Sequence, residues 1–228
     1  MKRKYISQEL LKLLACVTML VDHIGAIFYP QYVLFRVIGR IAFPIYAFLL
    51  AEGIAHTRNP KRYLIRLMIG LLLAELPFEL LFYGKLTYWH QSVMFTLFLG
   101  AVMLLWMKKS GWNILPFAVC FLVGKYMNAD YGRWGIALIW VFGVSANIPR
   151  RWVFQFLASG IVFYLMGSFP IPIWGLSIPI QMFGLLAMLP IFFYTGRKST
   201  SSKTLQWAFY LFYPLHLMIL LLIRNYLY

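Results

Sequence analysis

The chain has 228 residues, of which 62% are hydrophobic and only 12% are charged, and its mean hydropathy is +0.76. A soluble domain carries about twice that charged fraction. Several apolar runs approach the roughly 20 residues that a helix needs to cross a bilayer. The composition excludes an ordinary soluble protein and predicts an all-α polytopic membrane protein with a single domain over residues 1–228.

The net charge of +15 is also typical of nucleic-acid binding, but the basic residues stand in short clusters between the apolar runs. That arrangement is typical of cytoplasmic loops, so we expect no nucleic-acid partner. Cys16 and Cys120 lie inside apolar runs and indicate neither a disulfide framework nor a metal site. The basic residues 2–4 resemble the start of a signal peptide, but the run that follows is too long and includes Asp22 and His23. We therefore interpret it as the first span.

A compact bundle of about nine transmembrane helices is predicted, and eight to ten are compatible with the pattern. Breaks are expected at Asn59-Pro60, Ser110-Gly111, Ile148-Pro149, 170–179 and 196–202. The fifth, sixth and seventh spans are short for a crossing. With boundaries good to about 2–4 residues, the spans cover 8–28, 34–55, 63–82, 92–107, 112–127, 133–147, 152–167, 175–194 and 205–226.

The basic residues also predict an orientation. Fifteen of the 21 lysines and arginines fall on the side of the N-terminus. The positive-inside rule places that side in the cytoplasm. We expect a multi-pass protein of a bacterial cytoplasmic membrane, with the N-terminus inside and the C-terminus outside, surrounded by membrane lipids.

Ionisable residues inside the first span are the strongest functional signal. Asp22 and His23 interrupt LLKLLACVTMLVDHIGAIFY (residues 10–29), although a charge at mid-bilayer depth costs roughly 2.5–3.5 kcal/mol. A purely structural pair is the alternative interpretation. The predicted topology brings further polar residues to the same outer depth, which favours a shared, water-accessible cavity; these are Arg36, Arg40, Glu75, Glu79, His90, Asp130 and His216.

Helical spacing relates several of these side chains. Lys12 and His23 are eleven residues apart, so they share a face about 16 Å apart along the axis. Residues four apart also share a face, which pairs Arg36 with Arg40, Glu52 with His56, and Glu75 with Glu79. Pro77 is expected to kink the third span.

His23 is the candidate general base, because an imidazole titrates near neutral pH. Asp22 can orient it, but adjacent residues on a helix point about 100° apart. A carboxylate from another span, such as Glu75, is an equal candidate.

Six blocks of sequence resemble the TraX family, named for the protein that acetylates the N-terminus of conjugative F-pilin. They are TMLVDHIGAIFYP (18–30), FRVIGRIAFPIYAFLLAEGIAHTRNPKRYLIRL (35–67), AELPFELLF (74–82), HQSVMFTLFLG (90–100), NADYGRWGIALI (128–139) and FYPLHLMILLL (212–222). They follow the family's order along almost the whole chain. The family is similar to larger membrane acyltransferases that use acyl-CoA, in which a basic residue precedes a first-span histidine as Lys12 precedes His23.

The resemblance implies transfer of an acetyl or other short acyl group from cytosolic acetyl-CoA to an amine or hydroxyl on a pilin N-terminus, glycan, lipid or peptide. His23 would deprotonate this acceptor or carry the acyl group transiently. Lys12, Arg58, Lys61, Arg62 and Arg66 would hold CoA phosphates, or would only set topology and contact anionic lipids. Arg36 and Arg40 would steady the thioester carbonyl or an anionic acceptor. No metal is implied. The catalytic candidates are His23 and Asp22, and the binding candidates are Lys12, Arg36, Arg40, Glu52, His56, Arg58, Arg62, Glu75, Glu79, Gln91, Asp130 and His216.

Two other classes of function compete with this one. Intramembrane acids, histidines and arginines at one depth also suit a proton-coupled transporter or flippase, although no inverted repeat is visible. A membrane scaffold would leave the polar cluster unexplained.

Overall fold

The computed structural model describes residues 6–87, 89–148, 151–173, 175–196 and 203–227. Within these ranges it contains ten α-helices, two 3-10 segments and one hairpin of two strands, so the expected all-α membrane fold is confirmed. Pro149, part of the expected break at 196–202 and the basic residues Lys2, Arg3, Lys4, Arg150, Arg197 and Lys198 lie outside the described residues.

The first half of the chain forms long helices. The first is α1 (Gln8–Phe28), followed by α2 (Val33–Gly39), α3 (Ala42–His56), α4 (Pro60–Tyr83) and α5 (Val93–Ser110). The second half consists of α6 (Ile114–Tyr126), α7 (Gly132–Val144), η1 (Ser145–Asn147), α8 (Arg151–Met166), β1 (Pro170–Ile173), β2 (Leu176–Pro179), η2 (Ile180–Ala187), α9 (Met188–Phe192) and α10 (Lys203–Leu227).

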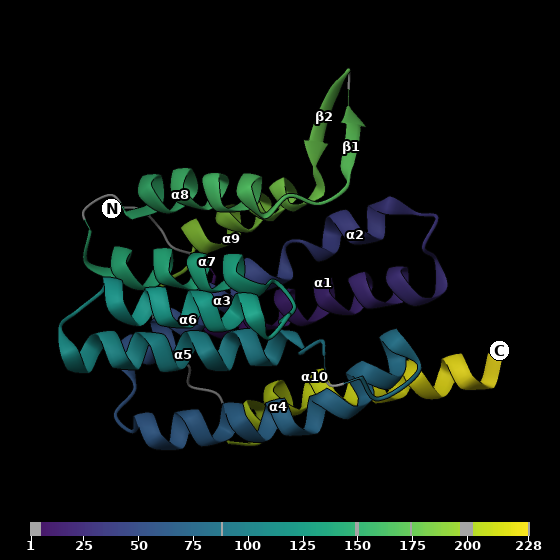
Figure 1. Ribbon diagram of the computed structural model, residues 1–228, viewed down its shortest axis with the longest axis horizontal. Helices are drawn as coiled ribbons and strands as arrows, with labels where there is room; N and C mark the ends of the chain where they lie inside the picture. Colours follow the sequence, from purple (N-terminus) through teal and green to yellow (C-terminus); the bar gives the residue numbers. More distant parts are fainter. Residues whose placement is uncertain (1–5, 88, 149–150, 174, 197–202, 228) are drawn as a thin grey trace.

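These elements make up nine segments that cross the bundle in alternating directions (Figure 1). In the described part of the chain, four segments are long and apolar enough to span a membrane: α1, α2 together with α3 (Val33–His56), α5 and the part of α10 from Thr204 onward. The helices α6, α7 and α8 have 13, 13 and 16 residues, which agrees with the expectation of short fifth to seventh spans. Large apolar side chains such as Leu72 and Leu76 on α4 are exposed, as a lipid-facing surface requires.

The eighth predicted span differs most from the structure. This span was expected over 175–194, but its start forms β2, which pairs antiparallel with β1 from the expected break, Pro170 opposite Pro179. Within the span only Ile180–Ala187 and Met188–Phe192 are helical. The reason is local, because Pro170, Pro172 and Pro179 lack a backbone N–H and disfavour a helix interior. By contrast, Pro77 lies within α4, which continues to Tyr83.

Helix ends follow ordinary capping chemistry. Ser7 accepts the Leu10 N–H at 3.2 Å at the start of α1, and Asn59 accepts the Arg62 N–H at 3.0 Å before Pro60 opens α4. Gly84 and Gly111 end α4 and α5 in the left-handed conformation. The breaks predicted at Asn59-Pro60 and Ser110-Gly111 therefore coincide with the actual boundaries of these helices.

The centre of the bundle is α3, which packs against α1, α5, α7 and the η2–α9 segment. Its apolar residues are buried almost all round, including Phe43, Ile45 and Phe48. On one side of this core, α4 packs mainly against α10 (Figure 1). Arg224 of α10 donates to the carbonyls of Leu81 and Leu80 at 2.6 and 3.1 Å, which places a cation at the C-terminal end of α4. The helices α4 and α10 therefore form a packed pair that lies beside the central helices.

Close packing of α1 on α2 gives a stability prediction. A Cβ atom at Gly25 would overlap the Cβ of Phe35 and lie 2.8 Å from its Cγ. Gly25→Ala should therefore lower the free energy of unfolding by about 1–3 kcal/mol, although alanine is the better helix former. Thermal unfolding in detergent, followed by tryptophan fluorescence, measures this loss.

Gly160→Ala in α8 is the matched control, because the nearest atom to its Cβ would be Leu185 Cδ1 at an ordinary 3.8 Å. It should be neutral or slightly stabilising. Equal melting of the two variants would contradict the close packing of α1 on α2.

Candidate active site

A cavity of about 320 Å³ lies inside the bundle, between the α4–α10 pair and the central helices. Gln8 and Lys12 line one end of it, His23 lines its middle, and Arg36 and Asp130 belong to the other end. We call these the Lys12 end and the Arg36 end. The helical face that the sequence assigned to Lys12 and His23 is thus the face that α1 turns toward the cavity.

At the Arg36 end, Asp22 lies between two arginines of α2 and its C-cap. Arg36 Nη1 is 2.8 Å from Asp22 Oδ2, and Arg40 Nη2 lies 2.9 and 3.0 Å from the two carboxylate oxygens. Asp22 and Arg40 are buried, whereas 30% of the Arg36 side chain is exposed. Gly39 makes this approach possible, because a Cβ there would overlap the Asp22 carboxylate. Asp22 therefore holds the arginines in place and neutralises part of their charge.

The loop before α7 closes the same end of the cavity. Tyr131 adopts a left-handed conformation with φ of 59° and stacks on Phe43 at 3.9 Å between ring centres. The Arg40 guanidinium lies 5.8 Å from the Tyr131 ring centre, within cation–π range. The Tyr131 N–H donates to Asp130 Oδ1 at 3.1 Å, and burial raises the pKa of the Tyr131 phenol to about 12. The phenol is therefore neutral at physiological pH.

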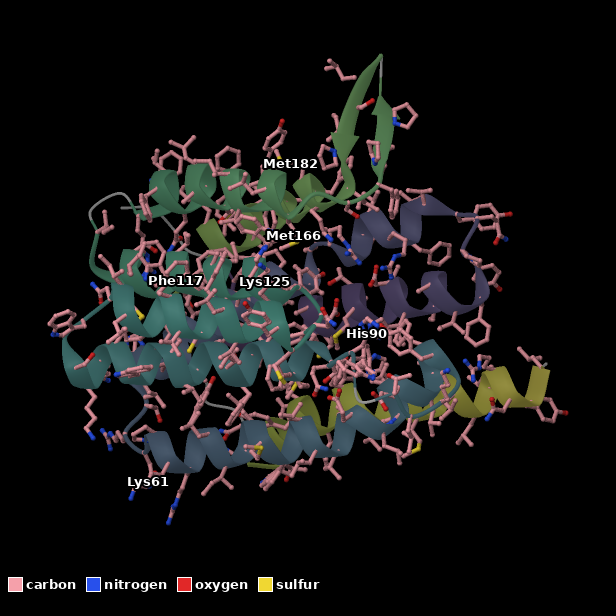
Figure 2. The ribbon with its side chains drawn as sticks, in the orientation of Figure 1. Lys61, His90, Phe117, Lys125, Met166 and Met182 are labelled. Atoms are coloured by element: carbon pink, nitrogen blue, oxygen red, sulfur yellow. The ribbon has the colours of Figure 1, made fainter. Side chains whose placement is uncertain are left out.

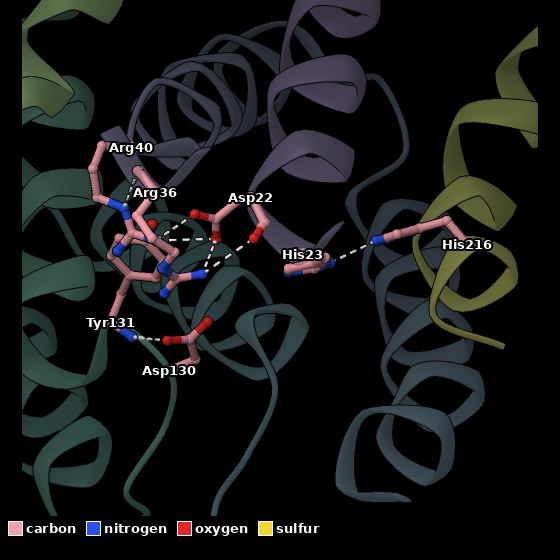
Figure 3. Close-up of polar contacts among 7 residues, drawn as sticks. All are labelled: Asp22, His23, Arg36, Arg40, Asp130, Tyr131 and His216. Atoms are coloured by element: carbon pink, nitrogen blue, oxygen red, sulfur yellow. Dashed lines mark hydrogen bonds and ion pairs between the residues drawn. The ribbon is translucent and has the colours of Figure 1, made fainter. Parts of the chain in front are cut away.

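His23 and His216 meet between α1 and α10. Nδ1 of His23 is 2.7 Å from Nε2 of His216, and Nδ1 of His216 is 2.7 Å from the Phe212 carbonyl oxygen. Both histidines are buried. Figure 3 shows His216 on one side of the His23 ring and the group of Asp22, Arg36 and Arg40 on the other. The edges of Phe82 and Tyr213 enclose His23, with ring centres 5.4 and 6.2 Å away.

Aromatic rings and cations surround the Lys12 end. Lys12 Nζ lies 5.4 Å from the Phe209 ring centre, and the Arg66 guanidinium lies 5.8 Å from Tyr63 and 5.4 Å from Tyr210. The buried Nε of Arg66 has no hydrogen-bond partner among the described residues. A buried donor in that state is costly unless a ligand or water completes it.

Glu75, Glu79 and Gln91, all predicted site residues, hold the connection between α4 and α5. Glu75 accepts the Ser92 N–H at 3.1 Å, and Glu79 accepts the N–H and hydroxyl of Thr87 at 2.9 and 3.1 Å. The carbonyl of Gln91 accepts the Asp130 N–H at 2.8 Å. The glutamates therefore support the rim of the cavity, and the hydrogen-bond partner of His23 is a histidine in place of the expected carboxylate.

Four further predicted residues lie toward the Lys12 end but away from the cavity. Glu52 accepts from Arg151 at 3.1 Å and lies 4.0 Å from His56, whose side chain is 63% exposed. Arg58 and Arg62 are exposed at the start of α4, where Lys61 projects away from the bundle (Figure 2). Of the predicted site residues, the cavity is lined by Lys12, Asp22, His23, Arg36, Arg40 and Asp130. Glu52, His56, Arg58 and Arg62 lie outside it.

Several cavity residues have no distinctive signal in the sequence. The contact of His23 with His216 joins residues 193 positions apart, and only the paired helices reveal it. Tyr63, Tyr210 and Tyr131 are ordinary aromatic residues in a chain that is 19% aromatic. In the described part of the chain, no three His, Cys, Asp or Glu side chains are grouped so that they could hold a metal ion.

Fold and site together define a multi-pass membrane protein with a buried, charged cavity containing a histidine. The model of the TraX protein family matches residues 7–224, so the chain belongs to this family. It is 28% identical over 229 residues to the probable fimbrial assembly protein FimC, serogroup H1, of Dichelobacter nodosus, which covers 92% of each chain. It is also 32% identical over 139 residues to the uncharacterized protein RP591 of Rickettsia prowazekii (strain Madrid E), which covers 58% of this chain and 53% of that protein. No solved structure matches the chain.

The charge network gives a second stability prediction. Asp22→Asn would leave the arginines around Asp22 without their counter-charge, and breaking a buried pair in this way typically costs 3–5 kcal/mol. Unfolding in detergent should show a loss of about this size. Adding Arg40→Met to this variant should recover part of the lost unfolding free energy, because the effects of substitutions within one network are not additive.

Glu52→Gln is the comparison variant, because Glu52 pairs with one arginine, the partly exposed Arg151, whereas Asp22 also holds the buried Arg40. We therefore expect a smaller loss in Glu52→Gln than in Asp22→Asn. If Asp22→Asn melted like Glu52→Gln, the Asp22 network would not be a main support of the fold.

Proposed function

We propose that this chain is an integral membrane acyltransferase that moves an acetyl or other short acyl group from acetyl-CoA to an amine or hydroxyl acceptor. The observation that carries the proposal is the position of His23. This buried imidazole lines the middle of a cavity that has a cation at the Lys12 end and two arginines at the Arg36 end. A positioned base and hydrogen-bond donors for the oxyanion are groups that catalyse acyl transfer, and a cation suits the phosphates of a CoA donor.

The Lys12 end suits the donor. CoA carries several phosphate charges, and Lys12 and Arg66 are cations placed among aromatic rings there. Arg66 does not itself line the cavity but contacts the lining residues Tyr63 and Tyr210, so it would add positive charge beside the donor's phosphates. Lys12 and His23 are about 16 Å apart along α1, so an extended pantetheine arm would reach from one to the other. In the expected orientation this end faces the cytoplasm, where acetyl-CoA is made.

The acceptor would enter from the Arg36 end. His23 would take a proton from its amine or hydroxyl as the nitrogen or oxygen attacks the thioester carbonyl. Each guanidinium has five donors, and those not engaged by Asp22 would stabilise the oxyanion. The C–S bond then breaks, and the imidazolium returns the proton to the CoA sulfur. The fimbrial name of the Dichelobacter nodosus relative favours an envelope polymer subunit as acceptor.

The first activity test is release of free CoA from acetyl-CoA by the protein in lipid vesicles, with cell-envelope extract as the acceptor source. His23→Ala should lower the rate at least about 100-fold, the lower range for loss of a general base. His90→Ala is the histidine control, because His90 stacks on Tyr83 at 4.7 Å between ring centres and is not among the residues that line the cavity. No CoA release by the wild-type protein would refute acyl transfer, and movement of protons or solute across the vesicles would then support a transporter.

A substitution at Lys12 distinguishes an effect on donor binding from an effect on the chemical step. Lys12→Gln removes a charge-assisted contact to phosphate, so it should raise KM for acetyl-CoA about tenfold or more while kcat is kept. The exposed Lys109 provides the matched lysine, and Lys109→Gln should leave KM unchanged. Equal KM values in the two variants would remove Lys12 from the donor site.

A further inference from the structure

The contact between the two histidines determines where the protons of both rings lie. A carbonyl oxygen can only accept a hydrogen bond. Because the Phe212 carbonyl oxygen is 2.7 Å from His216 Nδ1, that nitrogen must carry a proton. In a neutral ring the other nitrogen, Nε2, is then an acceptor. The 2.7 Å contact with His23 must therefore be donated by His23 Nδ1–H.

The ring geometry supports a true hydrogen bond in place of face-to-face stacking. The two rings are tilted by only 8°, and their centres are 5.0 Å apart. That separation equals the nitrogen-to-nitrogen distance plus one ring radius on each side, so the nitrogens point at each other along the line of centres. Both rings thus lie edge to edge in nearly one plane, with the lone pair of one aimed at the N–H of the other.

We propose that His216 is a positioning residue that fixes the tautomer of His23, so that the lone pair of His23 Nε2 faces the cavity. This inference rests on the proposed function, since it assigns the base of that reaction to one atom. Nδ1 and Nε2 lie on opposite sides of an imidazole, and the ring edge away from His216 faces Asp22 and Asp130 (Figure 3). Asp22 does not orient the His23 ring, because its carboxylate is bound to Arg36 and Arg40.

The chain of hydrogen bonds also supports the charged state of the reaction. When His23 Nε2 takes the acceptor's proton, the ring becomes a cation, and its Nδ1–H bond to His216 becomes charge-assisted and stronger. The proton at Nε2 then passes to the CoA thiolate as the C–S bond breaks, which restores the neutral ring. His216 keeps its own proton throughout, held by the Phe212 carbonyl. Its contribution therefore belongs to kcat and not to binding of the donor.

Two amide variants at this position form a matched pair. The amide of His216→Gln reaches the place of Nε2 and can accept from His23, whereas the shorter His216→Asn reaches only the place of Nδ1. His216→Asn and His216→Phe should lower kcat about 10- to 100-fold, the range seen when a partner that orients a histidine is lost. KM for acetyl-CoA should stay within about twofold of wild type, because Lys12 is untouched. His216→Gln should recover most of kcat. Equal losses in the Gln and Asn variants, with both proteins folded, would overturn the proposal.

A second measurement does not need activity. Nitrogen-15 spectra of histidine-labelled protein in detergent distinguish a protonated ring nitrogen from a bare one, and the His23 signals are those absent in His23→Gln. We expect His23 to be protonated at Nδ1 in the wild type and to become a mixture of tautomers in His216→Phe. If His23 is protonated at Nδ1 but the protein transfers no acyl group, the role of His216 in fixing the tautomer is supported and only the proposed function is refuted. Acyl transfer with His23 protonated at Nε2 would overturn the role of His216 alone.

Discussion

The ion-pair network of Asp22 with Arg36 and Arg40 is the constraint on which the rest of the site depends. A carboxylate at this depth is stable only when its charge is compensated, and both partners come from α2 and its C-cap. The network therefore fixes how α1 is rotated about its axis. Because the next residue points about 100° around the helix, His23 faces α10, where His216 meets it. One structural ion-pair network thereby aims the neighbouring imidazole.

Much of the fold could be predicted because apolar length and helix breakers act locally. The first seven spans begin and end near Asn59-Pro60, Gly84, Gly111 and similar signals that also cap the helices in the structure. The proline-rich region 170–179 forms a hairpin at the break expected there. The eighth span was expected to begin at residue 175, but its helical part begins only at Ile180, because the residues before it are apolar enough for a span yet end in Pro179. Mean hydropathy does not detect that proline lacks the backbone N–H that a helix interior needs.

The site was only partly predictable, and the reason is tertiary contact. The depth of Asp22, Arg36, Arg40 and Asp130 follows from topology, and the structure places all four at one cavity. Glu75 and Glu79 were expected beside them, yet they bind the backbone and hydroxyl groups of the α4–α5 connection. The partner of His23 depends on how α10 packs against α1, which no spacing within one helix reveals. Charged residues predicted at one depth of the membrane indicate a site, but they do not show which of the side chains line its cavity.

The cavity joins a cationic, aromatic end to an arginine-rich end, and His23 lies between them. Our proposal is that an acyl group passes from a donor at the first end to an acceptor at the second. Vesicles containing protein in a single orientation test it most directly, with labelled acetyl-CoA supplied on one side and envelope extract on the other. We expect labelled extract only when acetyl-CoA is on the Lys12 side and the extract is on the Arg36 side. Labelling that requires donor and extract on the same side would contradict it.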